Sequence, residues 1–349
     1  MSKLPVLEVR ELTVRSAERT LLQNVSFTVQ PGEWRALVGE SGSGKSVTAA
    51  AVMGMLPQEL ESTGTVFIEQ TDLGKLSKRE RRRFCGRHVG MIFQDYANSL
   101  TPSVRVGTQL KEVFRFSGGG NKKEADARIV EVLEQAELSP QAVLDKYPFE
   151  LSGGQLQRVA IAMAVIHRPP LLIADEATAS LDASTSKKMI SLIRNIQKQT
   201  GCAVLWITHD LHTVSRCADT VSVMYGGQMM EQLRLSGSEP AFVHPYSRLL
   251  FGSILRLVPE KRPLSFIPGD PAQISERGCS FALRCPYAVA SCDRERPSPH
   301  RMTDTHEVSC HVIHQGGLPH EHSASSGELK KELSQTTGIG SGQLLHSAR

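Results

Sequence analysis

The chain has 349 residues, a formal net charge of +4, and a composition of 40% hydrophobic and 22% charged residues. This length allows one large domain and a smaller one, and the composition is ordinary for a soluble globular protein. No apolar run reaches the roughly 18 residues of a membrane-spanning helix, and the N-terminal MSKLPVLEVREL lacks the apolar segment of a secretory signal. We therefore expect a cytosolic protein whose cysteine thiols are kept reduced.

The net charge gives no reason to expect a nucleic-acid partner. One segment, SKRERRRFCGR at 77–87, is strongly basic. We interpret it as the solvated face of a helix, with a phosphate-binding patch as the alternative.

The first part of the chain reads as β-strands. Leu7 and Val9, and then Val25, Phe27 and Val29, alternate with polar residues, which is typical of strands buried on one face. The apolar WRALV at 34–38 predicts a buried strand that leads directly into GESGSGKS.

Helices and buried strands alternate in the middle of the chain. An amphipathic helix is expected over 122–136, after the flexible SGGGN, and another helix over 183–199. The apolar runs at 171–175, 203–208 and 221–225 are typical of strands buried on both faces of a parallel sheet. This alternation predicts an α/β doubly wound core.

The segment GESGSGKS at 39–46 matches the phosphate-binding P-loop pattern and lies between a predicted strand and a predicted helix. Lys45 is expected to reach the β- and γ-phosphates, and the Ser46 hydroxyl to ligate Mg²⁺. The remaining loop residues that we expect to bind phosphate are Gly39, Ser41, Gly42, Ser43 and Gly44. Their backbone N–H groups surround the anion at the start of a helix.

An acidic pair follows the strand LLIAD. Asp175 is placed to reach the Mg²⁺ ion, and Glu176 to polarise an attacking water as a general base. Together with Lys45, this pair indicates hydrolysis of a nucleoside triphosphate rather than binding alone.

The segment LSGGQLQR at 151–158 resembles the signature of ATP-binding-cassette ATPases. Other motifs of that family occur in the order that it requires. Gln94 in MIFQD resembles the Q-loop glutamine, Asp182 in SLDAS resembles the D-loop aspartate, and His209 in ITHD resembles the switch histidine. The resemblance covers about residues 5–235.

The resemblance implies a RecA-like P-loop core with an antiparallel β subdomain and a helical signature subdomain at about 96–158. It implies that His209 contacts the γ-phosphate, and that Gln94 ligates Mg²⁺ and links the nucleotide to a membrane partner. The residues expected to bind the ATP of a facing subunit are Ser152, Gly153, Gly154 and Gln155 of the signature, with Asp182 beside them. Two cassettes would then enclose two ATP molecules.

Two positions depart from the family pattern. Ser16 stands near the position where the family usually has an aromatic residue that stacks on adenine, and the neighbouring Arg15 offers a guanidinium plane instead. Ala177 replaces the proline that usually follows the catalytic glutamate, and we expect a small effect on the backbone.

The C-terminal third carries a second resemblance. HPYSRLL at 244–250 and the segment at 267–292 resemble the C-terminal extension of the cytoplasmic ATPases of dipeptide, oligopeptide and nickel importers. We expect this extension over 236–313, with His244, Pro245 and Tyr246 in structural roles. The Gly-, Ser- and His-rich residues 314–349 are expected to be disordered.

Four of the seven cysteines lie in the extension: Cys279, Cys285, Cys292 and Cys310. Their C-x5-C-x6-C-x17-C spacing differs from the C-x2-C pairs of structural zinc sites. A thiolate metal site suits a reduced compartment, and the resemblance implies a [4Fe–4S] cluster, with zinc or unmetallated buried thiols as alternatives. His306 and His311 flank Cys310 and are possible replacement ligands. Cys85, Cys202 and Cys217 are interpreted as ordinary core residues.

The resemblance therefore implies an ATPase that powers import of dipeptides, oligopeptides, nickel or a related solute from the cytoplasmic face of the inner membrane, as a peripheral subunit. The implied partners are two transmembrane permease subunits, a second ATPase subunit in a homo- or heterodimer, and an extracytoplasmic solute-binding protein. One rival is a soluble cassette ATPase acting on nucleic acid or ribosomes, which would typically have two cassettes or a long coiled-coil insertion. A cassette exporter is the other, and it would lack this extension.

Overall fold

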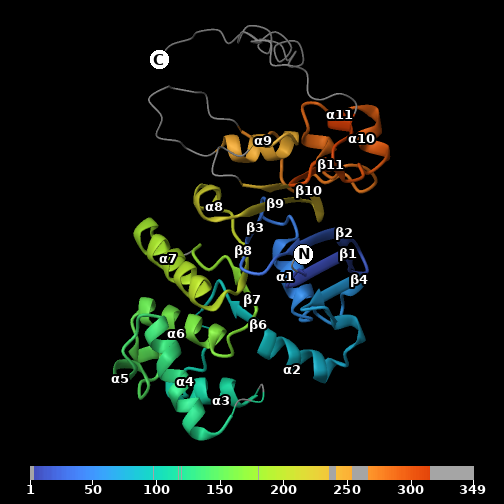
Figure 1. Cartoon of the computed structure of the whole chain (residues 1–349). Helices are drawn as coiled ribbons and strands as arrows, with labels where there is room; N and C mark the ends of the chain where they lie inside the picture. The colour runs from blue at the N-terminus through green and yellow to red at the C-terminus, as the bar shows by residue number, and fades with distance from the viewer. Residues whose placement is uncertain are drawn as a thin grey trace, which may run out of the picture.

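The computed structural model describes residues 4–96, 98–116, 118, 120–179, 181–235, 241–253 and 266–314. Two β-sheets form the centre of the molecule, with a group of helices at one end and the C-terminal segments at the other (Figure 1). We expect residues 314–349 to be disordered; His314 instead ends a short helix, and the rest of that segment lies outside the described residues.

The N-terminal sheet is antiparallel and has the strand order β2-β1-β4-β5. Its strands are β1 (Leu7–Arg15), β2 (Thr20–Val29), β4 (Glu61–Ile68) and β5 (Thr71–Asp72). Val25, Phe27 and Val29 of β2 are buried and alternate with more exposed residues. The alternation that predicted half-buried strands is confirmed.

The main sheet has eight strands in the order β11-β12-β10-β9-β3-β8-β7-β6. Its parallel part consists of β9 (Thr220–Tyr225), β3 (Trp34–Val38), β8 (Ala203–Ile207), β7 (Leu171–Asp175) and β6 (Val89–Ile92). Every residue of β3, β8 and β9 is buried, as expected for a sheet covered on both faces. The α/β core expected from the apolar runs is therefore confirmed.

Helix α1 (Lys45–Val52) lies between the two sheets, where Ala49 and Val52 pack with residues of β1, β2, β7 and β8. Helix α7 (Ala183–Thr200) buries Met189, Ile193 and Ile196 in a second core with the other face of the main sheet. The expected helix over 183–199 is thus confirmed.

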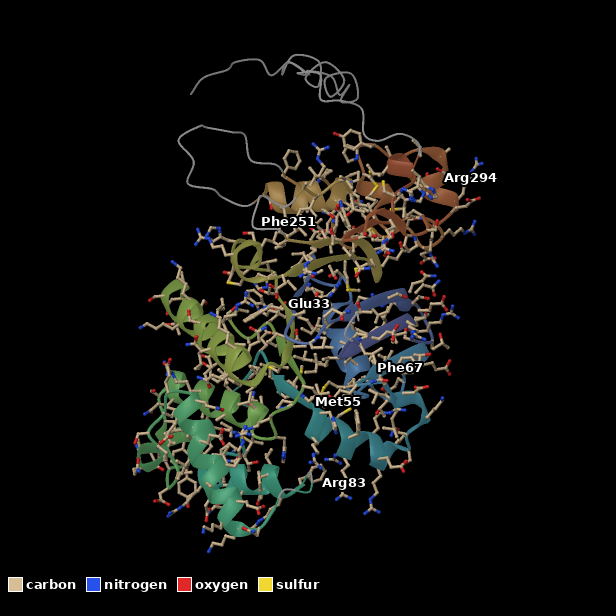
Figure 2. The ribbon with its side chains drawn as sticks, viewed as in Figure 1. Glu33, Met55, Phe67, Arg83, Phe251 and Arg294 are labelled. Atoms are coloured by element: carbon tan, nitrogen blue, oxygen red, sulfur yellow. The ribbon has the colours of Figure 1, made fainter. Side chains whose placement is uncertain are left out.

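The helical group contains α3 (Val106–Phe116), α4 (Lys122–Gln135), α5 (Pro140–Val143) and α6 (Gly153–Val165), with the single 3₁₀ turn η2 (Pro148–Glu150) before α6. Asn121 and Glu124 form a capping box at the start of α4, which fixes where this helix begins. The basic segment forms α2 (Lys78–His88), capped by Ser77 and Glu80 and preceded by η1 (Leu73–Lys75). Arg83 of α2 points away from the body of the molecule (Figure 2).

The C-terminal segments extend the main sheet. β12 (His306–Val308) pairs antiparallel with β10 (Gln228–Arg234) and with β11 (His300–Thr303). The helical elements there are α8 (Leu211–Cys217), α9 (Pro245–Gly252), η3 (Ala282–Arg284), α10 (Ala290–Arg294) and α11 (His311–His314). Tyr246 and Phe281 belong to the same hydrophobic core as Trp34 and Trp206 of the main sheet. None of the described helices is long and apolar enough to span a membrane.

Candidate ATP site

The P-loop joins the end of β3 to the start of α1. The Lys45 ammonium donates hydrogen bonds to the carbonyls of Gly39 and Glu40, both at 2.9 Å. A Cβ atom at Gly39 would lie 2.1 Å from the Met224 carbonyl oxygen, and one at Gly44 would lie 2.6 Å from Leu22. Close packing against β2 and β9 therefore requires these glycines.

The two proposed magnesium ligands meet at one end of this loop. The Ser46 hydroxyl donates to a carboxylate oxygen of Asp175 at 3.3 Å, although 129 residues separate them in the sequence. Burial raises the pKa of Asp175, while the hydrogen bond from Ser46 opposes this shift. Burial likewise lowers the pKa of Lys45. A divalent cation and phosphates would supply the opposite charges that these partly desolvated groups need.

Glu176 and His209 lie next to each other at the ends of neighbouring strands. His209 Nδ1 is 3.6 Å from Glu176 Oε1, and the Glu176 backbone N–H donates to the Ile207 carbonyl at 2.9 Å. Glu176 has φ 46, in the left-handed region that non-glycine residues rarely occupy. Such strain at the end of a buried strand is common at active sites, where it fixes the direction of a side chain.

Ala177, which replaces the usual proline, is buried, and its carbonyl accepts a hydrogen bond from the Gln157 amide at 3.1 Å. This bond joins the acidic pair to α6, the helix that begins with the signature.

The signature forms the exposed start of α6. Ser152 caps the helix through Gln155, and Ser152, Gly153 and Gly154 are all exposed. A Cβ atom at Gly154 would meet no atom within 4 Å, and one at Gly153 would meet the Tyr96 hydroxyl oxygen only at 3.7 Å. Packing within this chain therefore does not require glycine here, unlike at Gly39 and Gly44.

The D-loop and Q-loop residues lie outside these contacts. Asp182 is exposed and caps α7 by accepting from the backbone N–H groups of Ser184 and Thr185. Gln94 is exposed on the segment that follows β6. The contacts of the described residues therefore assemble one phosphate site from Gly39, Lys45, Ser46, Asp175, Glu176 and His209.

At the proposed adenine position, Arg15 is exposed at the end of β1, and Ser16 forms a tight turn with Arg19. Among the contacts of the described residues, no ion pair joins the Arg15 guanidinium to a side chain of that turn.

Two residues contact the P-loop although the sequence did not indicate this contact: Tyr246, which we expected only in a structural role, and Arg284. Tyr246 accepts a hydrogen bond at its hydroxyl from the Glu40 backbone N–H at 2.8 Å, and Arg284 forms an ion pair with the Glu40 carboxylate. Tyr246 belongs to the HPY motif and could have been suspected from it. Nothing near Arg284 in the sequence marks it except the two cysteines on either side.

The four C-terminal cysteines are free, and three of them are buried. Burial raises the pKa of Cys279 to about 12 and that of Cys285 to about 11, and neighbouring cysteines add to both shifts. They are thus close enough to interact. Even so, within the described ranges no group of three or more His, Cys, Asp or Glu side chains is placed to hold a metal ion.

The described residues therefore do not show the predicted metal site. A structural zinc ion requires four Cys or His ligands that converge on one point, and the described side chains include no such group. The magnesium prediction is not affected, because Mg²⁺ usually takes one or two protein ligands and completes its shell with phosphates and water.

Comparison with known proteins agrees with this site. The ABC transporter family model matches residues 22–179, and the model of the oligopeptide/dipeptide transporter C-terminal region matches residues 240–292. The dipeptide transport ATP-binding protein DppD of Escherichia coli (strain K12) is 38% identical over 320 residues, which cover 88% of this chain and 97% of that protein. The oligopeptide transport ATP-binding protein OppD of Bacillus subtilis (strain 168) is 37% identical, with 88% and 89% covered.

Solved structures show the same fold. The dimeric ATP-binding cassette MJ0796, in a post-hydrolysis state bound to ADP and Pi, has 28% identity and a TM-score of 0.58, with 66% of this chain and all of that chain covered. The structure of cbiO1 from Clostridium perfringens has 27% identity and a TM-score of 0.58, with 65% of this chain and 88% of that chain covered.

The fold and the phosphate site define an ATP-hydrolysing P-loop cassette. The chain belongs to the ABC transporter family, in the group of ATP-binding subunits with the oligopeptide/dipeptide type of C-terminal region. It is the ATPase subunit of a transporter, and ATP and Mg²⁺ fit its site.

Proposed function

We propose that this chain hydrolyses ATP to drive uptake of dipeptides or oligopeptides across the cytoplasmic membrane. The observation that carries the proposal is a phosphate site that lies in the same chain as a C-terminal region of the oligopeptide/dipeptide type. The relatives named for dipeptide and oligopeptide transport match over most of their length. Nickel, the other cargo that we expected, has no support among these relatives.

Within the ATP site, Lys45 neutralises the phosphates while Ser46 and Asp175 hold Mg²⁺. Glu176 accepts a proton from the attacking water, and His209 orients that water and the γ-phosphate. The backbone of Glu176 is left-handed, and its carboxylate lies 3.6 Å from His209 Nδ1, so both side chains can reach the same water. Gln94 would be a further ligand of Mg²⁺ and would link the nucleotide state to the permease.

The signature is proposed to act on the ATP of a second subunit. Gly153 and Gly154 are exposed at the start of the 13-residue helix α6, directly after its cap Ser152, and backbone N–H groups at such a helix start attract an anion. The open space around Gly154 supports approach of a group from outside this chain. Asp182 would lie at the same interface. We therefore propose a dimer of ATPase subunits, working with two permease subunits and an external solute-binding protein at the cytoplasmic face of the membrane.

The catalytic assignment is tested by Glu176→Gln, which removes the base but keeps the shape of the side chain. ATP binding should persist while the hydrolysis rate falls about 10²- to 10⁴-fold, the usual contribution of a general base. The exposed Glu59→Gln serves as the matched control and should hydrolyse ATP normally. Normal turnover by Glu176→Gln would contradict the assignment.

The cargo is tested in a strain that lacks the gene. Uptake of labelled dipeptide, labelled tetrapeptide and nickel should be compared with and without the wild-type gene and the Glu176→Gln gene. Peptide uptake restored by the wild-type gene alone supports the proposal. Restored nickel uptake with no peptide uptake would replace it.

We also propose that the four cysteines of the extension hold a [4Fe–4S] cluster. The support is the number and kind of these residues, because four free cysteines lie in the extension and four thiolates are what such a cluster requires. Anaerobically purified protein should contain iron and sulfide, and Cys285→Ser should lower both. Iron-free protein from iron-replete cells would leave these residues as buried thiols.

A further inference from the structure

Glu40, the second residue of the P-loop, is held by the C-terminal extension at two points. Arg284 Nη1 lies 2.6 Å from one Glu40 carboxylate oxygen, and Arg284 Nη2 lies 3.2 Å from the other. The Glu40 backbone N–H donates to the Tyr246 hydroxyl oxygen at 2.8 Å. Both the side chain and the backbone of one P-loop residue are therefore fixed by residues more than 200 positions away.

The ion pair is shielded from water. The side chain of Arg284 is 1% exposed and that of Glu40 is 19% exposed. Two parallel hydrogen bonds between a guanidinium and a carboxylate are directional and stronger than neutral ones. Removing either partner would leave a largely buried charge unpaired, which is costly.

Arg284 is itself held in place. Its Nε donates to the Pro268 carbonyl at 2.6 Å, and Nη1 also donates to the Tyr225 hydroxyl at 3.0 Å. Tyr225 is the last residue of β9, and its ring packs against those of Tyr246 and Phe281. The guanidinium therefore joins the P-loop to a rigid aromatic cluster.

The same cluster lies beside a second contact with the P-loop. Ser280 donates to the Tyr225 carbonyl at 3.0 Å, and Gly227, in the turn that follows, donates to the Ser43 carbonyl at 3.0 Å. Figure 2 shows Phe251 of α9 and Arg294 of α10 at the same end of the molecule, opposite Arg83. The extension thus holds the end of β9 through Ser280, and the turn that follows β9 contacts the P-loop.

What the ion pair fixes is the position of Lys45. The Lys45 ammonium donates to the Gly39 and Glu40 carbonyls, so the orientation of these two peptide groups determines where its charge lies. We propose that Arg284 is a positioning residue of the ATP site, acting through Glu40 on the P-loop and Lys45. This inference rests on the ATP-binding function of the site.

The test uses the full-length chain and a fluorescent ATP analogue with Mg²⁺, followed by steady-state hydrolysis. Arg284→Gln and Glu40→Gln should each weaken analogue binding and raise the KM for ATP about tenfold, with a smaller change in kcat. The double variant should have the same affinity for the analogue as the single variant with the lower affinity, because both changes remove the same contact. Arg301→Gln, which removes an exposed arginine of β11, is the control and should match the wild type.

Tyr246→Phe removes only a hydroxyl group, so it tests the same idea if Arg284→Gln fails to fold. We expect a rise of about threefold in the KM for ATP and an unchanged far-ultraviolet circular dichroism spectrum, which reports the folded backbone. Wild-type KM in all three single variants, or independent effects in the double variant, would overturn the role of Arg284. Failure of the wild-type chain to bind the analogue would instead count against the proposed function.

Discussion

Gly154→Ala separates the folding of the signature from its function. Gly154 is the second residue of α6, its φ is negative, and an added Cβ would meet no atom within 4 Å. Alanine is favoured over glycine in helices by up to about 1 kcal/mol, less at a helix end, so the free energy of unfolding should be unchanged or slightly higher. A folded and stable variant is therefore expected.

The ATPase activity of the same variant should fall. If the γ-phosphate bound to a facing subunit approaches the N–H groups at this helix start, the new methyl group stands in its path. A displacement of about 1 Å from the reactive position can lower a rate about 100-fold, and we expect a loss between tenfold and 100-fold. Nucleotide affinity of the isolated subunit should not change, since the P-loop is untouched.

The assay combines urea unfolding, nucleotide binding to the subunit and ATP hydrolysis by the assembled transporter. Lys123→Ala, an exposed residue at the second position of α4, is the matched control and should keep full activity. Wild-type hydrolysis by a folded Gly154→Ala protein would refute the idea that the open space serves a facing phosphate. A clear loss of stability would refute the packing argument instead.

Two further predictions concern stability. Gly39→Ala should lower the free energy of unfolding by about 1–3 kcal/mol and abolish nucleotide binding, because its Cβ would lie 2.1 Å from the Met224 carbonyl oxygen. Gly42→Ala has backbone strain at φ 78 but no neighbour for its Cβ, so it should cost less in urea unfolding than Gly39→Ala. Equal costs would contradict the clash. Burial lowers the pKa of His244 to about 4, although Glu231 opposes this. Its neutral form therefore stabilises the fold above about pH 6.5, and this stability is lost as the pH falls toward 4, by about 2 kcal/mol at pH 5. His244→Asn keeps an acceptor for the Tyr246 N–H. Its free energy of unfolding should therefore fall less than that of the wild type between pH 7.5 and pH 5. An equal fall would show that His244 is not the source of the pH dependence.

The sequence by itself determined the elements whose signals are local. The glycine spacing of the P-loop, the alternation in β1 and β2, and the apolar runs of β7, β8 and β9 each depend on residues that are neighbours in the chain. Backbone geometry and strand periodicity then decide the local structure. The family resemblance added the roles of the signature, the Q-loop and His209, which no periodicity reveals.

Only the tertiary structure decided which distant residues share a site. The Arg284–Glu40 ion pair joins residues 244 positions apart, and β12 completes a sheet that begins with β3. The strained backbone of Glu176 also follows from how β7 and β8 are held side by side. Such contacts depend on how the whole chain packs, because burial of the two hydrophobic cores brings these segments together whatever their spacing in the sequence.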